Sequence, residues 1–129
     1  MLHMTTPDVS LAFPDIFPIA QQRISDMTDG EDYDPDLHGP VVVVEPGDTI
    51  EQLEQDLGCS ILQDPWDGTR FGDDGFAPGF EILEEHPGFY ELVIVPADGD
   101  FGIVIFIPKQ DGISAELLHF CETYATAAP

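Results

Sequence analysis

The residues best suited to contacting another molecule lie in one irregular stretch, QDPWDGTRFGDDGFAPG, at residues 63–79. Arg70, one of only three basic residues in the chain, stands here among several Asp and aromatic residues. Aromatic side chains with a polar rim are typical of binding hot spots, and a guanidinium adds directional hydrogen bonds. The candidate binding set is Trp66, Arg70, Phe71, Asp73, Asp74 and Phe76.

Two interpretations of this stretch stay open. In the first, which we favour, Arg70 binds neighbouring carboxylates and stacks on Trp66 or Phe71, so that its role is to hold the loop together. In the second, the aromatic residues are exposed and anchor a partner. Loops of this length without regular structure are usually either functional or packed onto the protein.

A second acidic stretch imitates the beginning of a calcium-binding loop, because Asp32, Asp34 and Asp36 alternate along the chain. The imitation then ends. Leu37 stands at the sixth position, where the turn needs Gly, and Val43 stands at the twelfth, where a bidentate Glu should close the site. We expect a solvated acidic loop without metal and keep the three aspartates only as weak metal candidates.

Other catalytic patterns are missing or unspecific. The sequence has no Gly-rich phosphate loop ending in Lys, no HExxH and no GxSxG. Carboxylates on neighbouring predicted strands could form a general acid and base, and these are Glu81, Glu84, Glu85 and Glu91. Such pairs arise by chance in a chain with this many acids. We therefore expect a protein that is not an enzyme and that needs no cofactor.

Negative charge is the dominant property of the chain. Acidic residues outnumber basic ones by twenty-six to three, so the formal net charge is −23. Such a surface repels phosphates and anionic membranes, and we expect a basic protein as partner, with no direct nucleic-acid or membrane contact. Adaptation to high salt is another explanation, which the single Lys supports and the ample Ile and Phe content opposes.

The chain begins with a segment, residues 1–9, that we expect to be a flexible tail. Apolar residues then recur at helical spacing from Asp15, the expected cap, to a point before Gly30. Pro18 is compatible with this helix only in the first turn. The single expected domain covers residues 10–129, since no linker or repeat divides them.

A strand, a helix and a second strand are predicted next. Residues 40–45 are β-branched and apolar, which indicates a strand buried on both faces. Asp48 and Glu51 then predict a capping box at a helix start, and Gly58 predicts its end. Residues 59–62 form a short apolar run, so the unit predicts a right-handed parallel crossover.

Three strands in a meander and a last helix complete the prediction. The strands are residues 80–84, 89–95 and 101–107, with turns at 86–88 and 97–100. Ser114 is the expected cap of the last helix. Its buried face would comprise Leu117, Leu118, Cys121, Tyr124 and Ala125.

The predicted class is α+β, a mixed α/β sandwich with a mainly antiparallel sheet of about five strands packed by about three helices. The last two strands are apolar at nearly every position, so both sheet faces must be covered, by helices or by a second subunit. A homodimer is therefore a further expectation. Cys59 and Cys121 are expected to be buried free thiols.

The expected location is the cytoplasm. No apolar run approaches the roughly 20 residues of a membrane helix, and MLHMTTPDVS lacks the features of a secretory signal.

Three stretches carry a resemblance to a known group: EPGDTIEQLEQDLGC, DPWDGTRFGDDGFAPGFE and FGIVIFIPKQDGISAELLHFCETYA. Together they resemble small acidic proteins of bacterial integrative and conjugative elements, over residues 40–125. The resemblance implies a bacterial mobile-element context and no catalytic residues.

Two functions remain to be separated. The favoured hypothesis is a non-enzymatic acidic module that binds a basic protein and presents carboxylates as duplex DNA presents phosphates. The alternative is a small enzyme or ligand-binding protein that uses residues 63–79 over a carboxylate-lined pocket.

Overall fold

Five strands form one mixed sheet in the computed structural model, which describes residues 1–3, 9–28, 40–57, 61, 79–95 and 103–124. In space the strand order is β1-β2-β5-β4-β3. The strands are β1 (Leu2–His3), β2 (Val41–Val43), β3 (Gly79–His86), β4 (Phe89–Val95) and β5 (Ile103–Pro108). Strands β2 and β5 run parallel and every other neighbouring pair runs antiparallel, so the predicted α+β class and mainly antiparallel sheet are confirmed.

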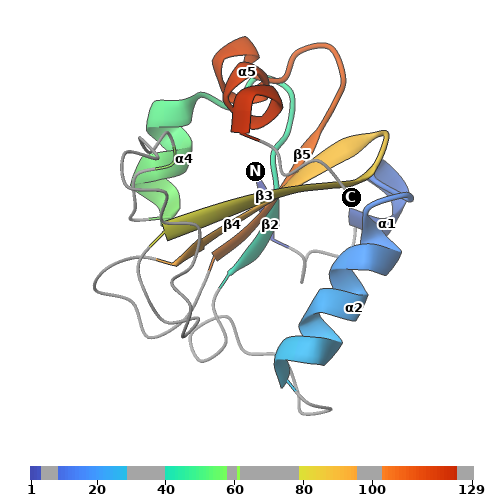
Figure 1. The fold of residues 1–129 in the computed structure, drawn as a ribbon. Coiled ribbons are helices and arrows are strands. Elements are labelled where there is room, and N and C mark those ends of the chain that lie inside the picture. Colours follow the sequence, from blue (N-terminus) through green and yellow to red (C-terminus); the bar gives the residue numbers. More distant parts are fainter. Residues whose placement is uncertain (4–8, 29–39, 58–60, 62–78, 96–102, 125–129) are drawn as a thin grey trace.

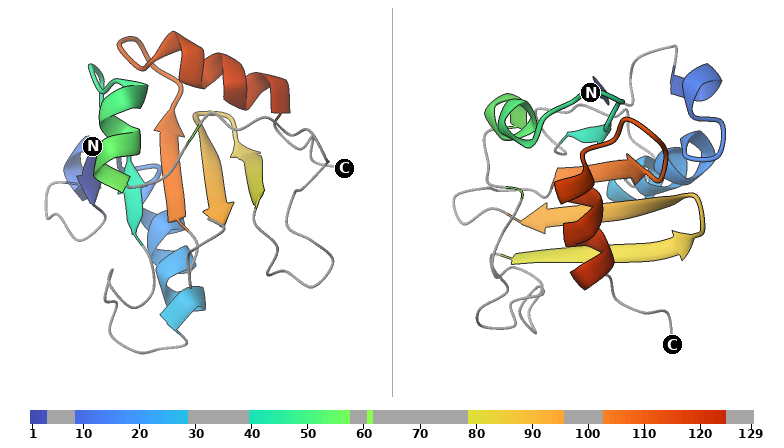
Figure 2. Two further views of the ribbon diagram at one scale, coloured as in Figure 1. Left: turned by 90° about the vertical axis from the view of Figure 1, so that its left-hand side faces the viewer. Right: turned by 90° about the horizontal axis from the view of Figure 1, so that it is seen from above.

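Helices lie over both faces of this sheet (Figure 1). They are α1 (Val9–Ala12), α2 (Phe17–Thr28), α4 (Ile50–Leu57) and α5 (Ala115–Tyr124). Helices α4 and α5 cover one face, and α1 and α2 cover the other, as the two turned views also show (Figure 2). The chain itself therefore supplies cover for both faces, which we had expected to require either helices or a second subunit.

Alternation along the strands explains why two apolar layers are needed. Val42 and Val44 join the core under α4 and α5, whereas Val41 and Val43 join the core under α2. Every residue of β5 is buried. A strand between two cores loses its polar positions on both sides, which is why its sequence is a nearly continuous apolar run.

The predicted meander is confirmed in the described residues. His86 pairs with Phe89 across the first turn, so Pro87 and Gly88 form its tip. The Gly88 N–H donates to His86 Nδ1 at 2.9 Å, and the His86 and Phe89 rings stack with centroids 4.7 Å apart. Strands β4 and β5 pair as far as Ile94 and Ile103, while the predicted turn at 97–100 lies outside the described residues.

Two long-range pairings differ from the sequence prediction. Leu2 and His3 pair antiparallel with β2, and Val9 begins α1, so these residues belong to the fold and not to a flexible tail. The parallel partner of β2 is not a strand at 59–62 but β5, in which Phe106 pairs with Val43 from 63 residues further along the chain. Of that predicted strand only Ile61 is described, and it is a buried bend.

Hydroxyl side chains cap the starts of α4 and α5. Ser114 Oγ accepts the N–H of Leu117 at 3.3 Å, which confirms the predicted cap of α5. The predicted capping box of α4 is wrong by one residue: Thr49 Oγ1 accepts the N–H of Gln52 at 3.1 Å, which makes Thr49 the cap. Asp48 is unavailable because its carboxylate accepts the N–H of Glu45 at 2.9 Å.

Helix α2 begins at Phe17, so Pro18 lies in the first turn as expected. Asp15 precedes the helix by two residues and lies in a turn that follows α1.

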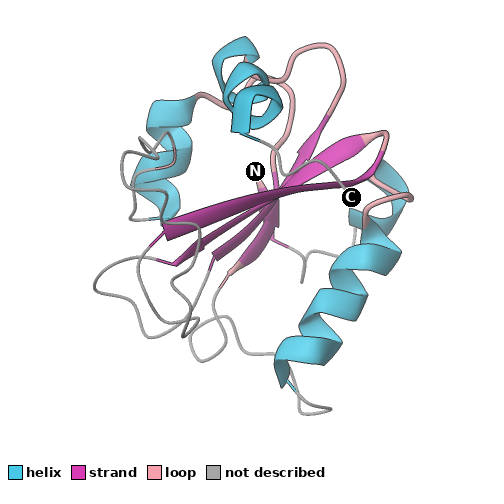
Figure 3. Cartoon of the chain, in the orientation of Figure 1, coloured by secondary structure: helices cyan, strands magenta, loops and turns pink. Residues whose placement is uncertain are grey.

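Colouring by secondary structure shows the sheet between its two helical layers (Figure 3).

Candidate interaction surface

A largely buried ion pair holds α2 against strand β4 of the sheet. Arg23 Nε donates to both carboxylate oxygens of Glu91 on β4, at 2.9 Å and 3.2 Å. The Glu91 side chain is only 5% exposed, whereas Arg23 is 28% exposed. A carboxylate so far from water requires a cation, and Arg23 supplies it from the helix above. The role of Arg23 is therefore structural, since its guanidinium neutralises a buried carboxylate of the same chain.

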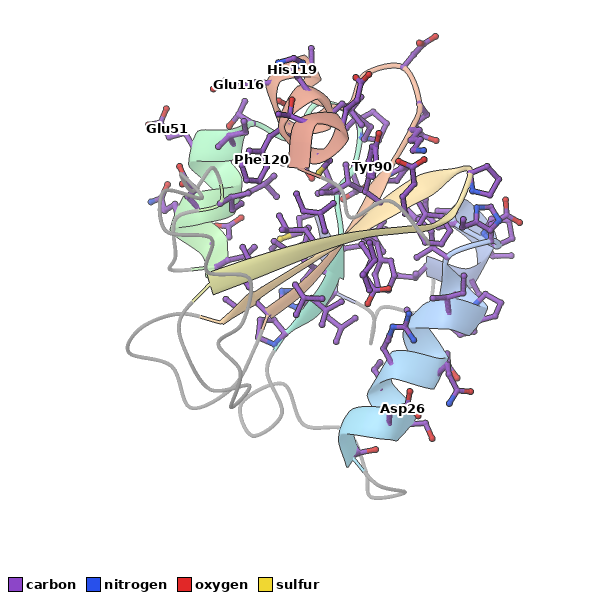
Figure 4. All side chains as sticks on the ribbon, in the orientation of Figure 1. Asp26, Glu51, Tyr90, Glu116, His119 and Phe120 are labelled. Carbon is purple, nitrogen blue, oxygen red and sulfur yellow. The ribbon has the colours of Figure 1, made fainter. Side chains whose placement is uncertain are left out.

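Lys109 is also bound within the protein. Its Nζ lies 3.3 Å from a carboxylate oxygen of Glu84 and 4.4 Å from the centre of the Tyr90 ring. The Tyr90 side chain is buried under α5 (Figure 4). Burial, followed by the negative charges of Glu84 and Glu122, raises the pKa of the Tyr90 hydroxyl.

The N-terminal ammonium of Met1 is the third cation in the described residues. It binds Glu45 Oε1 at 2.9 Å and also contacts the carboxylate of Asp48. Burial alone would lower the pKa of this ammonium, but the hydrogen bonds to Asp48 and Glu45 outweigh it and raise the pKa. These contacts hold the N-terminus against the segment that follows β2, beside the pairing of β1 with β2.

Exposed carboxylates without such a cation gather on one side of the molecule. We call this side the α4/α5 surface, and its exposed carboxylates are Glu51, Asp56, Asp111, Glu116 and Glu122. On the opposite helical layer the described exposed carboxylates are Asp15 and Asp26. Figure 4 shows Glu51 and Glu116 on α4 and α5, far from Asp26 on α2. Within the described part of the chain, negative charge is therefore asymmetric.

The α4/α5 surface contains an open hollow of about 420 Å³ between the starts of its two helices. Thr49, Glu51, Ser114 and Glu116 line it. Glu51 and Glu116 each lie in the first turn of their helix, where the positive end of the helix dipole favours a carboxylate. The backbone joins the two starts, because the Gly47 N–H donates to the Gly112 carbonyl at 2.9 Å.

Nucleophilic chemistry finds no support around Cys121. The thiol is buried and free, as predicted, and burial raises its pKa to about 12. His119 is exposed on the outer side of α5 (Figure 4). A thiol that stays protonated is a poor nucleophile. Cys59 lies outside the described residues.

The two meander carboxylates whose side chains are described, Glu84 and Glu91, do not form an acid and base pair. Glu91 faces the core under α2, where Arg23 binds it. Glu84 binds Lys109 beside Tyr90, whose ring belongs to the core under α5. The sheet therefore separates these two carboxylates. The side chains of Glu81 and Glu85 are not described.

The candidate residues singled out in the sequence lie outside the described part of the chain. They are Trp66, Arg70, Phe71, Asp73, Asp74 and Phe76, together with Asp32, Asp34 and Asp36. Their binding role stays a prediction, as does the enzyme hypothesis that depends on residues 63–79. The sequence alone does not reveal the α4/α5 surface, because its acids come from two helices and from the turn before α5, which only the fold brings together.

Among the described residues no cluster of three or more His, Cys, Asp or Glu side chains could hold a metal ion. Nor does any described helix have the length and apolar content to cross a membrane. In comparisons with protein-family profiles, curated proteins and solved structures, nothing matches this chain.

Proposed function

We propose that this protein is a non-enzymatic interaction module whose α4/α5 surface binds a basic protein. The observation that carries the proposal is which carboxylates are paired with a cation of the same chain and which are not. Arg23, Lys109 and the Met1 ammonium each bind carboxylates of the same chain. The exposed acids of α4 and α5 have no such cation in the described residues, and they attract an external one.

The placement of exposed carboxylates on two helices of one face also favours imitation of a nucleic acid. Duplex DNA presents phosphates on a rigid scaffold, and a protein that binds it does so through Lys and Arg side chains. The resemblance to proteins of mobile elements would make a host DNA-binding protein the partner. Nucleoid proteins and restriction enzymes are the first classes to test.

The proposal predicts binding that weakens steeply with salt. Purified protein is titrated with a nucleoid protein at several NaCl concentrations, and the logarithm of the affinity is plotted against that of the salt. A negative slope, with competition by duplex DNA, supports DNA mimicry. Affinity that does not respond to salt contradicts a recognition based on charge.

A matched pair of variants locates the binding surface. Glu51→Gln with Glu116→Gln removes two charges from the α4/α5 surface, while Asp15→Asn with Asp26→Asn removes two charges from the opposite layer. Both variants have the same net charge, so long-range attraction falls equally. We expect the first to weaken binding by about tenfold and the second by much less. Equal effects would contradict a preference for the α4/α5 surface.

A further inference from the structure

A cation of the chain itself, the Lys109 ammonium, borders the hollow beside Tyr90. This hollow has a volume of about 330 Å³, and Tyr90, Lys109, Asp111, Leu118 and Glu122 contribute to its lining. Lys109 Nζ lies over the Tyr90 ring at 4.4 Å. We call the Tyr90 ring and the surrounding carboxylates the Tyr90 cage.

The chemistry of the cage is that of a receptor for an ammonium or guanidinium group. The face of an aromatic ring attracts a cation, and carboxylates add charge-assisted hydrogen bonds. Glu84 contacts Lys109 Nζ at 3.3 Å, and Glu122 lies near enough to raise the pKa of Tyr90. Asp111 is exposed at the rim. One seated ammonium shows that the arrangement accepts this group.

The contacts of Lys109 in the cage are partly exposed to solvent and therefore weak. Its side chain is 26% exposed and that of Glu84 is 42% exposed, so water screens their attraction. Pairs of this kind contribute little to stability, and an external cation of similar chemistry can replace one partner at small cost. The buried Arg23–Glu91 pair differs, because its carboxylate is 5% exposed.

We propose that the Tyr90 cage receives a Lys side chain of the basic partner and that Lys109 is a tethered competitor which this side chain displaces. The inference rests on the proposed function and adds a defined docking point to it. The cage lies on the same side of the sheet as the α4/α5 surface, since α5 provides both Glu116 and the cage carboxylate Glu122. Figure 4 shows Glu116 and Tyr90 on this side. Contact with both regions would place the partner across α5.

Hexalysine is the probe, titrated into the full chain by calorimetry and by NMR of the Tyr90 ring at about 150 mM salt, where long-range charge effects are screened. Lys109→Gln removes the competitor and is expected to tighten hexalysine binding by about fivefold. The control is Gln21→Glu, an exposed change on α2 that gives the same net charge. Gln21→Glu should change the affinity by less than about twofold.

Substitutions of Tyr90 test the ring itself. Tyr90→Phe retains the aromatic face and should bind hexalysine as the unaltered chain does, whereas Tyr90→Leu should weaken binding by about threefold to tenfold. Glu122→Gln should weaken it more than Asp26→Asn, which removes an equal charge from α2. Should Tyr90→Leu fail to fold, the cage is tested by the comparison of Lys109→Gln with Gln21→Glu and by the change in the NMR signals of the Tyr90 ring when hexalysine is added.

Equal affinities for Lys109→Gln and Gln21→Glu, with Tyr90 ring signals unmoved by hexalysine, would overturn the cage. The proposed function would survive that result if binding to the basic protein still falls with salt and with the Glu51 and Glu116 substitutions. The opposite result is also informative. If binding of the basic protein does not depend on salt while hexalysine responds to the Lys109 and Tyr90 substitutions as expected, the proposed function is wrong and the cage remains a cation-binding site.

Discussion

Glu91 lies on the interior strand β4 and binds Arg23, a residue of α2 that precedes it by 68 positions in the chain. The contact joins β4 to α2 across the core that contains Phe89 and Phe106. An ion pair in this position orients the helix, because a displaced α2 would leave a carboxylate without a partner among apolar side chains.

Removal of Arg23 should therefore be costly. Arg23→Met is expected to lower the free energy of unfolding by about 3 kcal/mol, since Glu91 stays buried and unpaired. The double variant Arg23→Met with Glu91→Met should recover most of that loss, because neither charge is then buried. Urea unfolding followed by circular dichroism measures both. A single substitution that costs less than about 1 kcal/mol would show that the pair is unimportant.

Gly112 and Gly47 offer a matched test of packing at the joined helix starts. Both have positive φ, 91° and 93°, so Ala at either position should cost about 1 kcal/mol from the backbone alone. A Cβ at Gly112 would lie 2.8 Å from Pro46 Cβ, whereas one at Gly47 meets nothing within 4 Å. Gly112→Ala should thus lower the melting temperature more than Gly47→Ala. Equal decreases would mean that the Pro46 contact relaxes without cost.

Ionic strength should stabilise the protein. A net charge of −23 repels itself in the folded state, and salt screens that repulsion. Between about 20 mM and 300 mM NaCl we expect the melting temperature to rise by about 4 °C. A melting temperature that stays constant or falls is incompatible with strong self-repulsion. Failure to fold at all in dilute buffer would favour adaptation to high salt over recognition.

Alkaline pH should destabilise the protein for an identifiable reason. The pKa values of the Met1 ammonium and the Tyr90 hydroxyl are raised on folding, as is that of Cys121, to about 12. The folded state thus retains protons that the unfolded state releases, so stability is fully present below the unfolded pKa values and declines as the pH rises through the folded ones. The decline begins near pH 8, the ordinary value of the ammonium.

Glu45→Gln provides the control for the first part of that decline. It replaces the carboxylate that accepts a hydrogen bond from the Met1 ammonium with a neutral amide, and the lost negative charge should flatten the loss of stability just above pH 8. Urea unfolding at intervals from about pH 7 to pH 10 measures the slope. A slope identical to that of the unaltered chain would mean that Asp48 alone holds the proton.

Cys121 should resist thiol reagents. In a Cys59→Ser background it is the only thiol, and its burial together with a pKa near 12 leaves almost no thiolate at neutral pH. Alkylation by iodoacetamide should proceed only through unfolded molecules and should accelerate in urea. Rapid reaction of the folded protein would indicate that α5 opens locally.

Local signals predicted much of the fold. Ser114 caps α5, Pro18 lies in the first turn of α2, and Pro87 and Gly88 form the turn of the first hairpin. Each depends on residues within a few positions of one another. The sequence favours Asp48 over Thr49 as the cap of α4, because the contacts of Asp48 with Glu45 and Met1 form only once the fold brings the N-terminus to the turn after β2.

Long-range contacts account for the rest. The pairing of Leu2 with Val43 and of Val43 with Phe106 leaves no local pattern, since a strand of two or three residues has too few positions for alternation. The Arg23–Glu91 contact and the Tyr90 cage likewise join distant residues. The sequence predicts the excess of negative charge but not where on the surface it gathers. That location depends on α4 and α5 lying side by side in the fold.

Strand β3 closes one side of the described sheet and has a partner only in β4. An open strand of eight residues is a template on which a second copy could add and begin a fibril. Its sequence, GFEILEEH, places three glutamates along that border, and between two copies these would oppose one another. Acidification toward the isoelectric point of about 4.1 removes that protection, so the negative charge of the β3 glutamates is what keeps one copy from adding to another along this strand.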